Sequence, residues 1–313
     1  MEHVLTALKA MGHSERLRIV ALLSYGELTI SELVKILGLS QPRVTQYMKS
    51  LEDARVIERV KEGSWVFSRI NRSDRVLFKL VSTVLAQLPP EDAVLMADRR
   101  RLEDVRAARA FAADNFFTQV ANDDGQLGDE YLPREDLDLR VHRLIGEGRY
   151  EFMVDLGTGT GRMLELLAGQ VERGAGVDNS AEMLKVARHK LAARNFGHLS
   201  VRLGDLTATP FASGVADLVT VHQVLHYLDD PGEAIREAGR ILRNDGKALL
   251  VDFAAHSQED FREKYAHRRL GFNDQDITQW AAENHMQVTN IETITTHDSK
   301  PNVKLWLCEK KAV

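Results

Sequence analysis

Cysteine is almost absent from this sequence, because its 313 residues include only Cys308. One thiol cannot form a disulfide within the chain or build the thiolate clusters that bind zinc, arsenic or iron-sulfur centres. Long apolar runs are also missing, since none approaches the roughly 18 apolar residues of a membrane helix. The first residues lack the basic start and apolar core of a signal peptide. We therefore expect a cytoplasmic protein.

The remaining composition is that of a globular protein with two domains. Hydrophobic residues make up 44% and charged residues 28%, enough to build real cores, and a length of 313 residues exceeds one ordinary domain. The net charge of -5 is unevenly spread: residues 1–80 hold 13 Lys and Arg against 9 Asp and Glu, and the rest holds 28 against 37. A basic N-terminal region on an otherwise acidic chain indicates that this region binds a polyanion.

Prolines and hydrophobic periodicity divide the chain into three segments. Residues 1–88 read as short helices with one hairpin, and the Pro89-Pro90 pair ends that pattern. Residues 89–150 are polar and Ala- and Arg-rich, which predicts a helical connector and a lid with the aromatic residues Phe116, Phe117 and Tyr131. Residues 151–313 alternate apolar strands with amphipathic helices, which predicts an α/β domain with a mostly parallel sheet and an antiparallel hairpin at one edge.

The first segment carries a helix-turn-helix pattern followed by a hairpin. Ser40 is a good N-cap for the second helix, whose buried stripe is Val44, Met48 and Leu51. Lys61 lies by the hairpin turn, where it would contact phosphates together with Arg59 and Arg69. The opposite helix face carries side chains that can reach base edges or phosphates from a major groove: Gln41, Arg43, Thr45, Gln46 and Lys49. An ordinary solvated polar face is the alternative, but the order of the elements favours DNA binding.

The stretches SERLRIVALL, GLSQPRVTQYMKSLEDARVI and EGSWVFSRI resemble the ArsR family of winged-helix repressors. The resemblance implies an α+β winged helix-turn-helix domain, a homodimer and a two-fold symmetric double-stranded DNA operator. The dimer would use the first helix and a helix from Ser73 to Leu88. The apolar seam of that second helix comprises Leu77, Leu80, Val81, Val84, Leu85 and Leu88. Packing within one chain is the alternative explanation of this seam.

The chain departs from the metal-sensing members of that family. Residues 27–32 read ELTISE where those members carry cysteines, and no histidine occurs between His13 and His142. Soft thiolate and imidazole ligands are therefore missing from the first domain. We expect no metal cofactor and no metal sensing, so the regulatory signal must have another source.

The last segment contains a glycine motif, VDLGTGTGRM, between an expected strand and a helix. Glycine at 157, 159 and 161 lets the backbone turn sharply and approach a ligand. A dinucleotide-binding loop would place a small residue where this chain has Arg162, and Asp155 would repel a pyrophosphate. A carboxylate suits a ligand that carries ammonium and sulfonium charges.

With GVDNSAEML, GDL and VHQVLHYL, this motif resembles the class I methyltransferases that use S-adenosylmethionine (SAM), nearest to the UbiE-like group. The resemblance implies a Rossmann-like seven-stranded domain that binds SAM or S-adenosylhomocysteine. By that resemblance the methionine part would contact Asp155, Gly157, Thr158, Gly159, Gly161 and His222, the ribose Asp178, and the adenine Asn179, Ser180, Met183, Asp205 and Leu206.

The sequence assigns no catalytic residue firmly. SAM chemistry needs alignment of the acceptor and sometimes removal of a proton, so no particular base is demanded. His222, His226 and Tyr227 are candidates, although a histidine at a helix start more often packs or donates a hydrogen bond. Two functions fit: a regulator that methylates a small molecule, and a non-catalytic sensor of SAM or S-adenosylhomocysteine that controls operator binding.

Overall fold

The computed structural model describes residues 1–313 except 63–64, 72–73, 123–133, 297–299 and 312–313. It divides into two compact units, Met1–Ala112 and Ala113–Val313. The backbone of residues 109–122 is helical, and their side chains lie outside the description. The expected lid residues Phe116, Phe117 and Tyr131 therefore fall outside the described side chains. The expected boundaries at 88 and 150 stay a prediction.

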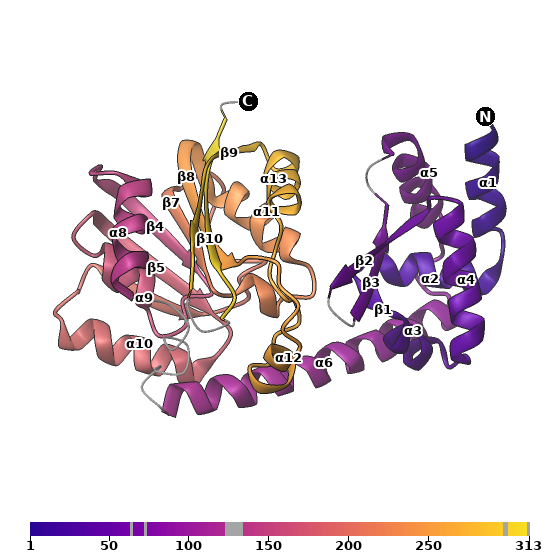
Figure 1. Cartoon of the computed structure of the whole chain (residues 1–313), viewed down its shortest axis with the longest axis horizontal. Helices are drawn as coiled ribbons and strands as arrows, with labels where there is room; N and C mark the ends of the chain where they lie inside the picture. The colour runs from indigo at the N-terminus through magenta and orange to yellow at the C-terminus, as the bar shows by residue number, and fades with distance from the viewer. Residues whose placement is uncertain (63–64, 72–73, 123–133, 297–299, 312–313) are drawn as a thin grey trace. The chain divides into compact units, whose positions relative to one another are not determined.

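The first unit is a helical domain with a small sheet (Figure 1). Its sheet has the order β1-β3-β2, and the antiparallel β2–β3 pair is the expected hairpin. Its elements are α1 (Glu2–Met11), α2 (Ser14–Leu23), β1 (Leu28–Thr29), α3 (Ile30–Leu37), α4 (Gln41–Asp53), β2 (Ile57–Glu62), β3 (Trp65–Ile70) and α5 (Arg75–Ala86).

Local sequence signals explain the helix-turn-helix. Thr29 and Glu32 form a capping box at the start of α3, and Gly38 ends that helix in the left-handed conformation with φ 67°. Helix α4 buries Val44 and Met48 completely, as its periodicity predicts. Ser40 occupies the N-cap position of α4 with an extended backbone, as expected, but its side chain makes no capping hydrogen bond.

A long helix, α6 (Ala93–Asn122), follows the Pro89-Pro90 pair and crosses the division between the units. Its first turns belong to the core of the first unit through Leu102 and Val105. Asp98 is 2% exposed and accepts two hydrogen bonds from Arg18 of α2, at 2.6 Å from Nε and 2.7 Å from Nη2. This bidentate pair holds α6 against α2 of the first unit.

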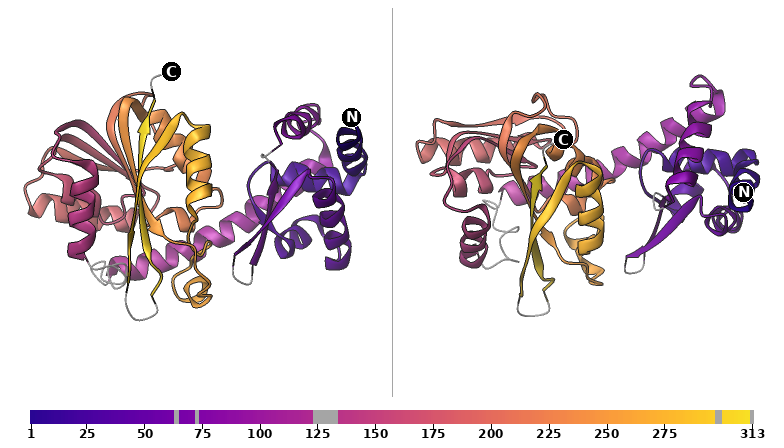
Figure 2. Two further views of the ribbon diagram at one scale, coloured as in Figure 1. Left: turned by 45° about the horizontal axis from the view of Figure 1, so that its top comes forward. Right: turned by 90° about the horizontal axis from the view of Figure 1, so that it is seen from above.

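The second unit is built on a seven-stranded sheet with the order β6-β5-β4-β7-β8-β10-β9 (Figure 2). β10 runs antiparallel to both β8 and β9, and the other neighbours are parallel. The strands are β4 (Tyr150–Leu156), β5 (Val171–Asp178), β6 (Leu199–Leu203), β7 (Ala216–His222), β8 (Leu242–Phe253), β9 (Met286–Ile294) and β10 (Val303–Lys310). The expected α/β class and the edge hairpin are confirmed.

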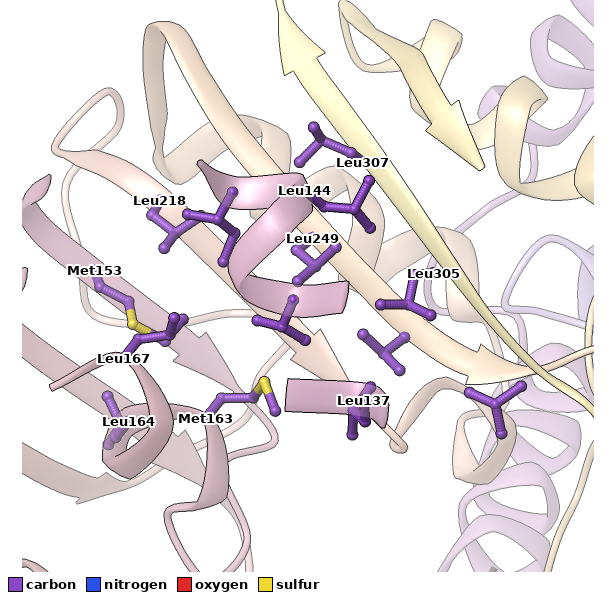
Figure 3. Close-up of a cluster of buried hydrophobic side chains, with 14 of the residues drawn as sticks. Leu137, Leu144, Met153, Met163, Leu164, Leu167, Leu218, Leu249, Leu305 and Leu307 are labelled. Carbon is purple, nitrogen blue, oxygen red and sulfur yellow. The ribbon is translucent and has the colours of Figure 1, made fainter. Parts of the chain in front are cut away.

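Helices cover both faces of this sheet. The helices are α8 (Arg134–Ile145), α9 (Arg162–Leu167), α10 (Ala181–Ala193), η1 (Leu225–Tyr227), α11 (Pro231–Ile241), α12 (Asp260–Lys264) and α13 (Asp274–Glu283). Alternate strand residues enter different cores: Met153 packs with α8 and α9, whereas Val154 packs with α11 and α13. Figure 3 shows the core that α8 and α9 form on one face of this sheet, with Leu137 of α8, Met163 of α9 and Leu249 of β8. In the described part of the chain, no helix is both long and apolar enough to span a bilayer.

Removing the Arg18 side chain leaves the buried Asp98 carboxylate without its main partner. Uncompensated buried charges cost about 3–5 kcal/mol. Arg101 lies 3.5 Å from the same carboxylate and offsets part of that loss. We expect Arg18→Ala to lower the free energy of unfolding of the first unit by about 3 kcal/mol, measured by urea unfolding with amide hydrogen exchange. The control Arg59→Ala, which breaks a surface pair with Glu52 in the same unit, should cost about 0.5 kcal/mol. Equal losses would contradict this account.

Candidate functional site

The loop between β4 and α9 brings the backbone close to the carboxyl edge of the sheet. Gly157, Gly159 and Gly161 have φ values of 71°, 50° and 84°, a region that side chains with a Cβ rarely adopt. The amides of Gly157 and Thr158 both donate to the Val177 carbonyl, at 2.8 and 3.0 Å. A Cβ at Gly157 would lie 2.6 Å from the Val224 side chain, whereas one at Gly159 would meet nothing within 4 Å. The loop therefore leaves no room for a side chain at Gly157, whereas the space beside Gly159 is open.

Asp155, at the end of β4, is a buried carboxylate beside this loop. Its side chain is 1% exposed and accepts a hydrogen bond of 2.6 Å from the Thr220 hydroxyl of β7. Burial raises the pKa of Asp155 to about 6, against the effect of that hydrogen bond. At neutral pH the group is mostly ionised, so a cationic ligand at this edge would be stabilised by it.

Asp178, at the end of β5, ties the glycine loop to the neighbouring strand. One carboxylate oxygen accepts from the Gly159 amide and the other from the Ser180 amide, both at 2.8 Å. Burial raises the pKa of Asp178, and the backbone hydrogen bonds oppose that rise. The Asn179 amide is a third backbone donor to this carboxylate, so Asp178 already accepts three of the roughly four hydrogen bonds that an ionised carboxylate can take.

The other residues expected to contact adenine lie near the ends of β5 and β6. Ser180 caps α10 by accepting from the Met183 amide, and Met183 is 6% exposed. Asn179 is exposed, and Leu206 is 8% exposed. Asp205 accepts from both the amide and the hydroxyl of Thr207, at 2.8 and 2.7 Å. The structure thus places these residues at the same sheet edge, and their ligand contacts stay predictions.

The candidate bases lie where β7 ends. His222 is half-buried, and burial lowers its pKa to about 4, so it is neutral at physiological pH. His226 is 1% exposed, and its Nδ1 lies 2.7 Å from Oδ1 of Asp252 in β8. Burial also raises the pKa of the Tyr227 phenol, which therefore stays protonated. Asp252 was not among the expected residues, although an acidic residue within the apolar run ALLVDF was a usable signal.

In the first unit, α4 presents all five expected polar side chains to solvent: Gln41, Arg43, Thr45, Gln46 and Lys49. Arg43 donates to the Tyr47 hydroxyl at 2.9 Å, lies 3.8 Å from a Glu15 carboxylate oxygen and stays half-exposed. On the hairpin, Lys61 is exposed, whereas Arg59 and Arg69 form ion pairs with acidic residues of the same unit. The exposed cations suited to DNA are therefore Arg43, Lys49 and Lys61.

Family models match both units. Residues 13–59 match the model of bacterial regulatory proteins of the arsR family, and residues 154–250 match a methyltransferase domain. The chain joins an ArsR-type helix-turn-helix to a methyltransferase domain.

Curated relatives include proteins named as methyltransferases. The chain is 31% identical over 128 residues to YcgJ, an uncharacterized methyltransferase of Bacillus subtilis, covering 41% of this chain and 51% of that protein. It is 30% identical over 117 residues to the ubiquinone/menaquinone biosynthesis C-methyltransferase UbiE of Geotalea uraniireducens, covering 36% and 50%. The chain therefore spans about half the length of these relatives.

Solved structures agree on the fold of this domain. A chain from the complex of the Haloferax volcanii Trm112 methyltransferase activator with a methyltransferase aligns with a TM-score of 0.53 at 22% identity, over 63% of this chain and 98% of that one. A methyltransferase-fold protein of Bacillus halodurans aligns with a TM-score of 0.50 at 18% identity, over 57% of this chain and 100% of that one. At such identities the likeness establishes the Rossmann-like fold.

No three His, Cys, Asp or Glu side chains within the described ranges are grouped as metal ligands would be. The expected lack of a metal cofactor stays a prediction.

The glycine loop permits a direct test of its geometry. Gly157→Ala combines a left-handed φ with a Cβ that would overlap Val224, so we expect the methyltransferase domain to lose about 2–3 kcal/mol of stability. Adding Val224→Ala should restore only the part due to overlap. Gly169→Ala is the matched control, because its Cβ meets nothing within 4 Å. Thermal denaturation measures all four proteins. A Gly157→Ala variant as stable as Gly169→Ala would show that the loop is not constrained as described.

Proposed function

We propose that this chain is a DNA-binding transcription regulator whose methyltransferase domain binds SAM and methylates a small molecule. One observation carries the proposal: the glycine loop brings its backbone to the two carboxylates Asp155 and Asp178 at one edge of the sheet. An acidic edge repels a pyrophosphate and attracts a nucleoside with ammonium and sulfonium charges. The relatives named for ubiquinone and menaquinone biosynthesis support a small-molecule acceptor.

The residues at this edge fit SAM or S-adenosylhomocysteine part by part. Asp155 and the open backbone around Gly159 would hold the methionine part, and the Asp178 carboxylate would accept from the ribose hydroxyls. The buried thioether of Met183 and the side chain of Leu206 would pack on the adenine. When bound, SAM supplies an electrophilic methyl group. The chain's own residues orient the acceptor toward that methyl group and exclude water.

The helix-turn-helix unit would place α4 in the major groove, with Lys61 of the hairpin on a phosphate. A homodimer would present two such helices to a two-fold operator. Of the six expected seam residues, Leu77 and Val81 are 1% exposed within their own unit, whereas Leu80, Val84, Leu85 and Leu88 are partly exposed. Leu5 and Leu8 of α1, with Val76 of α5, are 48%, 41% and 60% exposed. These three side chains are the apolar surface that we assign to the dimer.

A second candidate function is a sensor of SAM or S-adenosylhomocysteine that acts without turnover. The observation in its favour is helix α6, which contributes Leu102 and Val105 to the core of the first unit and continues to Asn122 beyond the division at Ala112. A continuous helix can transmit a ligand-dependent shift of its far end. Enzyme and sensor share the nucleoside site, so coupling to DNA is compatible with both.

DNA recognition by α4 makes a prediction that separates base contacts from phosphate contacts. Arg43→Ala and Gln46→Ala should each weaken specific operator binding by about 1–3 kcal/mol, because a good side-chain contact to a base edge contributes that much. Lys61→Ala should weaken binding to operator and random DNA alike. Arg188→Ala, an exposed arginine of α10, is the control and should change neither. Gel-shift titrations on both DNAs measure these effects, and unchanged operator affinity in both helix variants would exclude this docking.

Coupling between nucleoside and DNA is tested by operator affinity with and without saturating SAM or S-adenosylhomocysteine. We expect the nucleoside to change the affinity by about 5- to 150-fold, the usual range of allosteric coupling. Asp178→Ala should abolish the response and leave the DNA affinity of the free protein intact. Glu182→Ala, which removes an exposed carboxylate of α10, should respond like the wild type. Fluorescence anisotropy gives the curves. Identical wild-type curves under all conditions would eliminate the sensor and leave the enzyme.

A further inference from the structure

A buried histidine–carboxylate pair lies at the ends of β7 and β8. His226 and Asp252 are 1% and 0% exposed, and their Nδ1 and Oδ1 atoms are 2.7 Å apart. The same Asp252 oxygen accepts from the Phe253 amide at 2.7 Å, which fixes the carboxylate. Neither residue takes part in the nucleoside contacts assigned above.

The pair determines which nitrogen of His226 is the acceptor. We assign Asp252 as the acceptor of this hydrogen bond, because an ionised carboxylate can only accept, and a neutral His226 as its donor through Nδ1. Nε2 then bears a lone pair, and it has no hydrogen-bond partner among the described residues. A buried acceptor without a partner costs about 1–3 kcal/mol. Such an atom calls for a ligand that donates a hydrogen bond to it.

Aromatic rings pack around the His226 imidazole. The His226 ring centroid lies 4.1 Å from that of Tyr227, 4.0 Å from that of His267 and 5.2 Å from that of Phe253. Burial lowers the pKa of His267 far below its ordinary value, so this neighbour stays neutral. The rings around His226 therefore suit a flat molecule. Because His226 is 1% exposed, entry of that molecule requires neighbouring side chains such as His267 to move aside.

Strand register places this pair beside the nucleoside edge. In adjacent strands Asp155 pairs with Thr220, and two residues further along β7 His222 pairs with Val251, the residue before Asp252. The ends of β4, β7 and β8 therefore form one continuous edge. A molecule contacting His226 would lie on the β8 side of the nucleoside.

From this geometry we propose that His226 is the general base for a hydroxylated aromatic acceptor, and that Asp252 is its positioning residue. The inference rests on the proposed function and adds the class of acceptor. His226 Nε2 takes the hydroxyl proton while the acceptor oxygen forms its bond to the methyl carbon. The carbon–sulfur bond breaks with its electron pair going to sulfur, which leaves S-adenosylhomocysteine. The imidazolium, stabilised by Asp252, then releases its proton to solvent.

Two acceptors of different acidity separate a base from a structural histidine. At mildly alkaline pH phenol keeps its proton, whereas 4-nitrophenol has already lost it. Transfer of labelled methyl from SAM to phenol should fall about 100-fold or more in His226→Gln, the usual contribution of a general base. Transfer to 4-nitrophenol should fall only a few-fold. His189→Gln, at an exposed site of α10, should behave as wild type with both. Equal losses on the two acceptors would overturn the role of His226.

A second readout needs no turnover. Long-range ¹⁵N NMR of the full chain should show His226 protonated at Nδ1 and bare at Nε2, and Asp252→Asn should remove that preference. A proton on Nε2 in the wild type would overturn the proposal. Calorimetric titration with SAM separates the failures: no nucleoside binding defeats the proposed function, whereas binding without methyl transfer to either acceptor defeats only this inference.

Discussion

The burial of two carboxylates at one sheet edge constrains the whole methyltransferase domain. Asp155 and Asp178 close neighbouring parallel strands, and each is desolvated enough to raise its pKa. Such groups are costly unless hydrogen bonds or a cationic ligand compensate them. The Thr220 hydroxyl and the Gly159 amide supply part of that compensation. The left-handed backbone at Gly159 brings its amide to Asp178, so the conformation of the glycine loop and the charge at this edge depend on each other.

Much of the fold could be predicted from the sequence because its signals are periodic and local. Val44 and Met48 at helical spacing and Gly38 at a left-handed turn specified the helix-turn-helix. The alternation of short apolar strands with helices specified the parallel sheet. The sequence could not show that α6 packs on the first unit, because the Arg18–Asp98 pair joins residues 80 positions apart. The expected dimer seam also included Leu77 and Val81, which lie in the core of the first unit. Helical spacing alone does not distinguish an interface from a chain's own core.

The nucleoside edge was more predictable than the acceptor side. Each expected cofactor residue belongs to a short motif at a strand end, so chain order alone places Asp155, Asp178 and Asp205 at one edge. His226 was recognised only as one of three candidates, and Asp252 was missed. Their pairing depends on the register between β7 and β8, which a sequence does not reveal. The resemblance to methyltransferases covers only the cofactor motifs, so the acceptor site has to be inferred from the geometry of the structure.

Selectivity for a sulfur-containing nucleoside over a dinucleotide is the central claim of this account. Its most direct test is calorimetric titration of the full chain with SAM, S-adenosylhomocysteine and NAD under one set of conditions. The acidic edge predicts one site per chain for SAM and for S-adenosylhomocysteine, and no heat from NAD. Binding of NAD, or of none of the three, would contradict it.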